Sequence, residues 1–111
     1  LIQILQEKQF PLPDDDHTLI TLKTGDRAEA DYVYNTIENK TILIFVDGTS
    51  KSLHGNPATA RKDKLFRLKA QNEGYLTLEI TKQGLQDDVR IYDFLQKLAI
   101  YLNKEELITD E

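Results

Sequence analysis

The sequence predicts a single α/β domain in which helices flank a mixed sheet, with elements in the order α-β-β-β-α-β-α. Segments that alternate apolar and polar residues, as half-buried strands do, stand beside segments with apolar residues at helical spacing. The segment "TILIFV" is apolar without a break, which suits a central strand covered on both faces. A length of 111 residues, 40% of them hydrophobic, provides one core and too little chain for two domains.

The first part of the chain is expected to form a helix and then three strands. "LIQILQEKQ" has apolar residues at helical spacing, and the prolines of "PLPDDDH" end that helix in a loop. "TLITL" predicts a strand over residues 19–22, which the turn Thr24-Gly25-Asp26 closes. A second strand is expected over 28–35, and a turn at Glu38-Asn39 leads into "TILIFV" as the third.

The second part is expected to form helix, strand and helix. Asn56 suits a helix N-cap, Pro57 the first helical position and Gly74 the end, which predicts a helix over 57–73. "YLTLEI" predicts the fourth strand, and "QDDVRIYDFLQKLAIYLN" an amphipathic helix with Asp87 and Asp88 at its positive end. Because the third and fourth strands flank a helix, we expect them to be parallel with a right-handed crossover.

Composition limits the classes of function. Cysteine is absent, so a bound metal would need carboxylates, His17 or His54, which favours a hard cation such as magnesium. No apolar run approaches the roughly 20 residues of a membrane helix, and no signal-peptide pattern opens the chain. We therefore expect a cytoplasmic protein without membrane contact. The chain starts at Leu1, and we expect it to be a piece of a longer protein.

The charges are distributed unevenly. A net charge of -5 argues against a free-standing nucleic-acid binder, yet five Lys/Arg against two Asp/Glu lie within residues 56–74. Arg61, Lys64 and Arg67 recur every three residues and could contact phosphates, with Lys62 and Lys69 beside them. The exposed side of an amphipathic helix would carry the same charges without any partner. Both interpretations stay open from the sequence.

Two acids are expected to meet in the hairpin of the second and third strands. If this hairpin is centred near Glu38, Asp31 faces Phe45, and Asp31 and Asp47 become diagonal neighbours on one face. At a backbone separation of roughly 7 Å the two carboxylates could hold one cation. The alternative is that Asp47 is a solvated turn residue, because Asp-Gly is a common turn pair.

Other candidate groups are weaker. His17 could join Asp14, Asp15 and Asp16 around a cation, although a solvated acidic loop accounts for the same residues. Glu7 on the first helix is expected to face solvent rather than a site. Tyr92 and Tyr101 lie within the pattern of the last helix and are expected in the core, not as stacking platforms.

Several motifs together resemble one nuclease family. "ADYVY", "ILIFVDG", a histidine at His54, "RKDKLFRLKAQNEGY" and a closing strand resemble the very-short-patch-repair endonuclease-like branch of the PD-(D/E)xK nuclease superfamily, over about residues 28–82. The chain is similar to the version at the C-terminal end of large prokaryotic DEAD/DEAH-box helicase-like proteins, including those of phage defence. The resemblance implies a restriction-endonuclease-like αβββαβ core, here followed by a C-terminal helix, with Mg²⁺ as cofactor and DNA and a larger helicase-like polypeptide as partners.

The resemblance also implies roles for single residues. Asp31 matches the first metal-binding aspartate, and Asp47 the metal-binding aspartate of the Asp-Gly element. His54 matches the histidine after it, a general base or water-positioning group. Asp63 and Arg67 match the helix positions of a "D…R" pattern.

The chain also departs from this family. Active relatives often carry a glutamate two residues before Asp-Gly, where this chain has Phe45, and the motif lysine is replaced by Thr49. Lys51 is the nearby substitute, and we expect it to contact DNA together with the helix cations. Three functions stay open: a magnesium-dependent endonuclease using Asp31, Asp47 and His54, an inactive DNA-binding or structural accessory domain, and a protein-interaction module using the last helix.

Overall fold

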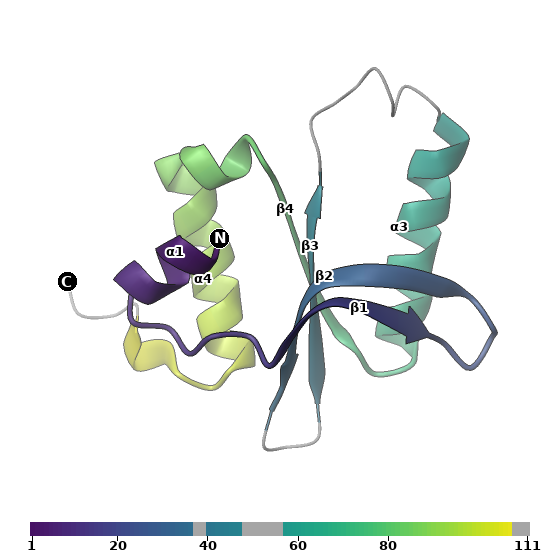
Figure 1. Cartoon of the computed structure of the whole chain (residues 1–111), viewed down its shortest axis with the longest axis horizontal. Coiled ribbons are helices and arrows are strands. Elements are labelled where there is room, and N and C mark those ends of the chain that lie inside the picture. The colour runs from purple at the N-terminus through teal and green to yellow at the C-terminus, as the bar shows by residue number, and fades with distance from the viewer. Residues whose placement is uncertain (37–39, 48–56, 108–111) are drawn as a thin grey trace.

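The structure, a computed structural model, describes residues 1–36, 40–47 and 57–107, with the backbone alone for 57–60. Its helices and strands follow the predicted order (Figure 1). They are α1 (Ile2–Glu7), β1 (Asp15–Thr21), β2 (Arg27–Asn35), β3 (Thr41–Asp47), α3 (Pro57–Asn72), β4 (Leu76–Thr81) and α4 (Asp88–Tyr101), with 3₁₀ turns at Gly84–Gln86 and Glu105–Leu107. None of the helices described is long and apolar enough to cross a membrane.

The four strands form one mixed sheet in the order β1-β2-β3-β4. The first two pairings are antiparallel, and β3 and β4 are parallel, as predicted from the helix between them. Tyr32 lies opposite Ile44 in the β2–β3 hairpin, which is the register that the sequence predicts. The mixed sheet flanked by helices is therefore confirmed.

The first strand differs from its prediction. It begins at Asp15 and ends at Thr21, so two acids expected in a loop lie in the strand. The backbone N–H of Asp14 donates to the carbonyl of Val33 at 2.8 Å, and the Asp14 carboxylate accepts from the N–H of Asn35 at 2.6 Å. These contacts extend the pairing with β2 beyond the apolar alternation. The acids remain exposed, as charged residues on an edge strand commonly are.

One side of the sheet is covered by α1 and α4 (Figure 1). The cluster on this α4 side holds eleven buried residues, all of them hydrophobic: Leu5, Phe10, Tyr34, Ile42, Ile44, Leu78, Ile80, Phe94, Leu95, Leu98 and Ala99. Asp87 caps α4 by accepting from the backbone N–H groups of Val89 and Arg90, as its position predicts. The prediction that Tyr92 is in the core is wrong, because its side of α4 faces solvent and 51% of the residue is exposed. Tyr101 is packed against the cluster.

The other side of the sheet is covered by α3, toward which the β1–β2 hairpin curves (Figure 1). The cluster on this α3 side holds eight buried residues: Ile20, Leu22, Ala30, Val33, Leu43, Phe45, Phe66 and Ala70. Gly74 follows α3 with φ +102°, a conformation that favours glycine, which confirms its predicted place at the helix end. Strand β3 thus contributes to both clusters, which confirms the prediction of a central strand.

Candidate functional site at the ends of β3 and β4

Asp31 lies where β2 separates from β3. The β2–β3 pairing runs from Asn35 to Tyr32, while β2 continues beside β1. The Asp31 carboxylate accepts the backbone N–H of Val46 at 2.7 Å, beyond the last pair of the ladder. A side-chain oxygen therefore takes the place that a β2 carbonyl would have in a longer ladder. In β1, opposite this point, His17 has φ +45°, which departs from the extended strand conformation.

Asp47 is the last residue of β3 and is bound to Arg67 from α3. The guanidinium donates from Nη2 to Oδ1 at 2.7 Å and from Nη1 to Oδ2 at 3.2 Å, a two-point contact. Glu79 of β4 approaches the same guanidinium, with 3.1 Å between Nη1 and Oε2. The arginine side chain is 11% exposed, while the two carboxylates are 41% and 48% exposed. One cation is therefore shared by two acids from neighbouring parallel strands.

The arginine also stacks on an aromatic ring. Its guanidinium carbon lies 4.3 Å from the centre of the Phe45 ring, a distance at which a cation is attracted to the ring face. Phe66 supports this ring edge-on, with 6.5 Å between the ring centres. Phe45 is thus an apolar platform for Arg67.

The environment keeps Arg67 charged. Burial disfavours the charge, but the hydrogen bond and charge of Asp47 and the charge and hydrogen bond of Glu79 outweigh it. The pKa of the Arg67 guanidinium is accordingly raised above its ordinary value. Among the described residues of this site, two carboxylates face one guanidinium, which is an excess of negative charge.

The predicted magnesium donors do not form a free cation site in this arrangement. One oxygen of Asp31 is bonded to the backbone, and both oxygens of Asp47 are bonded to Arg67. Within residues 1–36, 40–47 and 57–107, no three acids or histidines are grouped so that they could hold a metal. The magnesium site stays a prediction, and it requires Arg67 to leave Asp47.

The predicted DNA-binding residues of α3 do not all lie on the same side of the helix. Arg61 and Lys64 are exposed, as are Lys62 and Asp63, whereas Arg67 is turned to the sheet. Six residues of α-helix rotate the side-chain direction by about 600°, roughly 120° short of two whole turns, so Arg61 and Arg67 lie on different sides. Lys69 is bound to Asp26 of the β1–β2 turn at 3.0 Å. His54 and Lys51, like the proposed cap Asn56, lie outside the described residues.

The remaining candidates do not join this site. His17 and Glu29 are both exposed, with 3.7 Å between Nδ1 and Oε2, and Asp14 is bonded to the backbone of Asn35. Glu7 is exposed on α1, as expected. The sequence did not predict that Arg67 pairs with Asp47, or that Glu79 contacts the same guanidinium. The signal available was an acid within the apolar strand "YLTLEI", beside a strand that itself ends in an acid.

Comparisons with protein-family models, with curated proteins and with solved structures find no match to this chain.

Proposed function

We propose that the chain is an accessory domain with a restriction-endonuclease-like αβββαβ core, which binds DNA through α3 as part of a larger helicase-like polypeptide and does not cleave it. The observation that carries the proposal is the two-point bond between Arg67 and Asp47, with Glu79 on the same guanidinium. This bond engages the carboxylate that an active nuclease would offer to a metal.

The bonds between Arg67 and Asp47 argue against metal-dependent cleavage. A magnesium ion at the end of β3 would have to displace hydrogen bonds between charged groups, which are stronger than neutral ones. It would also expel Arg67 from the ring of Phe45 and leave the guanidinium partly buried without its partners. Arg67 instead balances the charge of Asp47, so the carboxylate has a counter-charge without an ion.

The exposed cations of α3 support DNA binding. We call Arg61, Lys62 and Lys64 the α3 basic surface; all three are exposed, with Asp63 as the acid among them. Phosphate contacts release counterions, so each contact adds roughly 0.9 to the steepness of the salt dependence. Because the surface is short and the chain is acidic overall, we expect weak binding that disappears as salt rises.

Charge reversal of the basic surface tests the proposal. Lys62→Glu/Lys64→Glu should reduce duplex binding at low salt by tenfold or more, because attraction to phosphate becomes repulsion. The matched control is Lys8→Glu/Lys40→Glu, two exposed lysines on other parts of the chain with the same change in net charge. Fluorescence anisotropy at several salt concentrations measures both. Equal loss in the two variants would mean that overall charge, not α3, sets the affinity.

Cleavage assays separate the accessory domain from the metal-dependent endonuclease. With Mg²⁺ or Mn²⁺ and single-stranded, duplex or branched DNA, we expect no cleavage by the wild-type chain or by the full-length protein that contains it. Metal-dependent nicking that His54→Ala and Asp47→Ala each abolish, without a lower melting temperature, would overturn the accessory role. Calorimetry with Mn²⁺ adds a readout without DNA: wild type should not bind it, whereas Arg67→Met leaves Asp47 and Glu79 available to the ion.

A further inference from the structure

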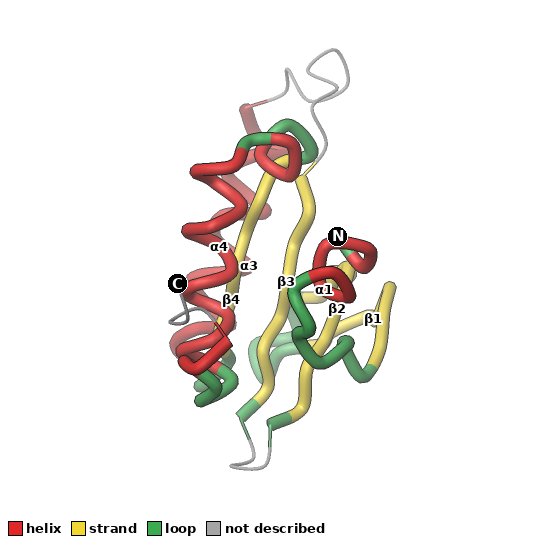
Figure 2. The backbone as a smooth tube through the Cα atoms, turned by 90° about the vertical axis from the view of Figure 1, so that its left-hand side faces the viewer, coloured by secondary structure: helices red, strands yellow, loops and turns green. Residues whose placement is uncertain are grey.

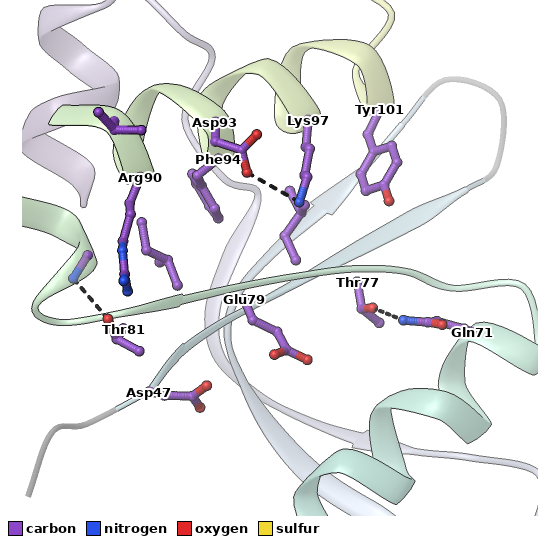
Figure 3. A pocket seen from close by; sticks show the side chains of 14 residues that line it. Asp47, Gln71, Thr77, Glu79, Thr81, Arg90, Asp93, Phe94, Lys97 and Tyr101 are labelled. Atoms are coloured by element: carbon purple, nitrogen blue, oxygen red, sulfur yellow. Dashed lines mark hydrogen bonds and ion pairs between the residues drawn. The ribbon is translucent and has the colours of Figure 1, made fainter. Parts of the chain in front are cut away.

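A groove runs along the free edge of β4. It encloses about 670 Å³ and is bordered by β4 itself, by α4, and by Gln71 at the end of α3. Within the described residues, β4 has β3 on one side and no strand on the other. Figure 3 shows β4 crossing the groove, with Arg90, Lys97 and Tyr101 projecting from α4 on one side and Glu79 and Asp47 on the other.

The edge of β4 presents backbone groups that its own sheet does not use. The N–H of Lys82 donates to the carbonyl of Asp47 at 3.0 Å. This bond shows which residues of β4 direct their backbone groups toward β3. In such a ladder alternate residues bond to the same neighbour, so Leu78 and Ile80 face β3. The N–H and C=O groups of Thr77, Glu79 and Thr81 therefore point into the groove. A row of this kind is a template for a further strand.

The side chains define the charge that the groove accepts. On the side of the groove toward α3, here called the α3 wall, Glu79 and Asp47 are both about half exposed, and Arg67 is the cation that they share among the described residues. The described part of this wall therefore carries an excess of negative charge. On the α4 wall, each cation has an acid beside it: Arg90 lies 3.8 Å from Asp87 and Lys97 lies 3.3 Å from Asp93. A lysine or arginine on an incoming strand, beside Glu79, would balance the excess charge on the α3 wall.

The position of α4 selects against a symmetric dimer in which two β4 edges pair. Figure 2 shows α4 beside the outer side of β4, away from β3. A second copy has its own β4 edge beside its own α4, so the two edges would be held apart by the two helices. A single extended segment without flanking helices can enter between the walls. Six residues of β4 offer roughly 20 Å of edge to such a segment.

We propose that this groove binds an extended peptide segment of a partner protein, which adds a fifth strand beside β4 and places a lysine or arginine next to Glu79. The backbone groups of Thr77, Glu79 and Thr81 supply the affinity, and the charge at Glu79 supplies the selectivity. This site is separate from the α3 basic surface, so it can operate whether or not the domain binds DNA.

The probe is a capped nonapeptide of alternating valine and lysine, titrated into the 111-residue chain and followed by amide hydrogen exchange and by calorimetry. We expect slower exchange at the amides of Thr77, Glu79 and Thr81. The amides of Leu78 and Ile80, already bonded within the sheet, are the internal control. A peptide N-methylated at alternate residues keeps its charge and loses its donors, and should bind at least about tenfold more weakly.

Two variants distinguish the contribution of the backbone hydrogen bonds to peptide binding from that of the Glu79 charge. Glu79→Gln keeps the N–H and should weaken binding roughly fivefold, because a charge-assisted contact is lost. Glu79→Pro also removes an N–H that points away from β3, so it should abolish binding while leaving the ladder to β3. Should Glu79→Pro fail to fold by circular dichroism, the N-methylated peptide decides instead.

Two results with the peptides would overturn the proposal: an unmethylated peptide that leaves the amides of Thr77, Glu79 and Thr81 unprotected, or equal binding by the methylated and unmethylated peptides. Protection that appears with rising protein concentration and no peptide also overturns it, because the occupant is then a second copy.

Discussion

The two sides of the sheet are stabilised in different ways. The α4 side buries eleven hydrophobic residues, six of which are leucine or isoleucine from the sheet and α4. The α3 side buries eight, including the small Ala30 and Ala70, and adds charged contacts at its periphery. These contacts join α3 to both ends of the sheet: Arg67 to β3 and β4, Lys69 to Asp26, and the Glu73 carboxylate to the N–H of Lys23.

This difference indicates which side of the sheet should respond to pH and salt. Burial of apolar surface depends little on pH or salt, whereas ion pairs at a surface are screened by salt. The hydrogen bonds from Thr24 and then from Lys69 hold the pKa of Asp26 below its ordinary value. Near neutral pH, the stability contributed by the α4 side should therefore depend little on salt, whereas the contribution of the α3 side should fall as salt rises.

The largest effect is expected from the α4 side. Leu98→Ala removes a side chain that is fully buried between α4 and the sheet, which should lower the free energy of unfolding by about 2–5 kcal/mol. Urea unfolding at low and high salt measures this value, and the loss should be the same at both. A loss below about 1 kcal/mol would show that the α4 side is not the main source of stability.

A smaller and salt-dependent effect is expected from the α3 side. Arg67→Met leaves Asp47 and Glu79 to repel each other and removes the charge above Phe45, which should cost about 2 kcal/mol at low salt. The matched control is Lys97→Met, which breaks an exposed pair with Asp93 on α4 and should cost only about 0.5 kcal/mol. Equal losses in the two variants would remove the distinction between the buried and the exposed pair.

The smallest effect is expected at Tyr34, whose hydroxyl donates to the carbonyl of Pro11 at 2.7 Å. Tyr34→Phe should cost about 1 kcal/mol at neutral pH. Burial, and after it the charge of Asp14, raises the pKa of the Tyr34 phenol, so the folded state keeps a proton that the unfolded chain releases near pH 10. Stability should therefore fall as pH rises above about 10 in the wild type, and less steeply in the variant. Parallel slopes in alkaline unfolding curves would contradict this assignment.

Much of the fold follows from local patterns in the sequence. The unbroken apolar run of β3, the acid that caps α4 and the glycine after α3 each predict a feature that the structure contains. These signals act over a few residues, so they do not depend on tertiary contacts. The register of the β2–β3 hairpin agrees with the one predicted from the sequence, because the pairing of Tyr32 with Ile44 has the expected centre.

The arrangement of the site could not be predicted in the same way. The recurrence of Arg61, Lys64 and Arg67 suggested one surface, but rotation along α3 turns Arg67 toward the sheet, where Phe45 and two acids stabilise it. Its partners come from two strands far apart in the sequence, and only the packing of α3 selects them. The early start of β1 likewise depends on contacts of Asp14 with β2, not on apolar periodicity.

The complete burial of Ile42, Leu43 and Ile44 has a consequence for the folding chain. Before α3 and α4 dock, the segment from Thr41 to Val46 is an uncharged, strongly β-forming hexapeptide without proline, the type of sequence that stacks into intermolecular sheets. Lys40 and Asp47 stand directly on either side of it. Their charges oppose stacking of identical chains, because each would meet its own copy in the next layer. We therefore expect Asp47 to oppose aggregation of the nascent chain, a role that does not require a metal.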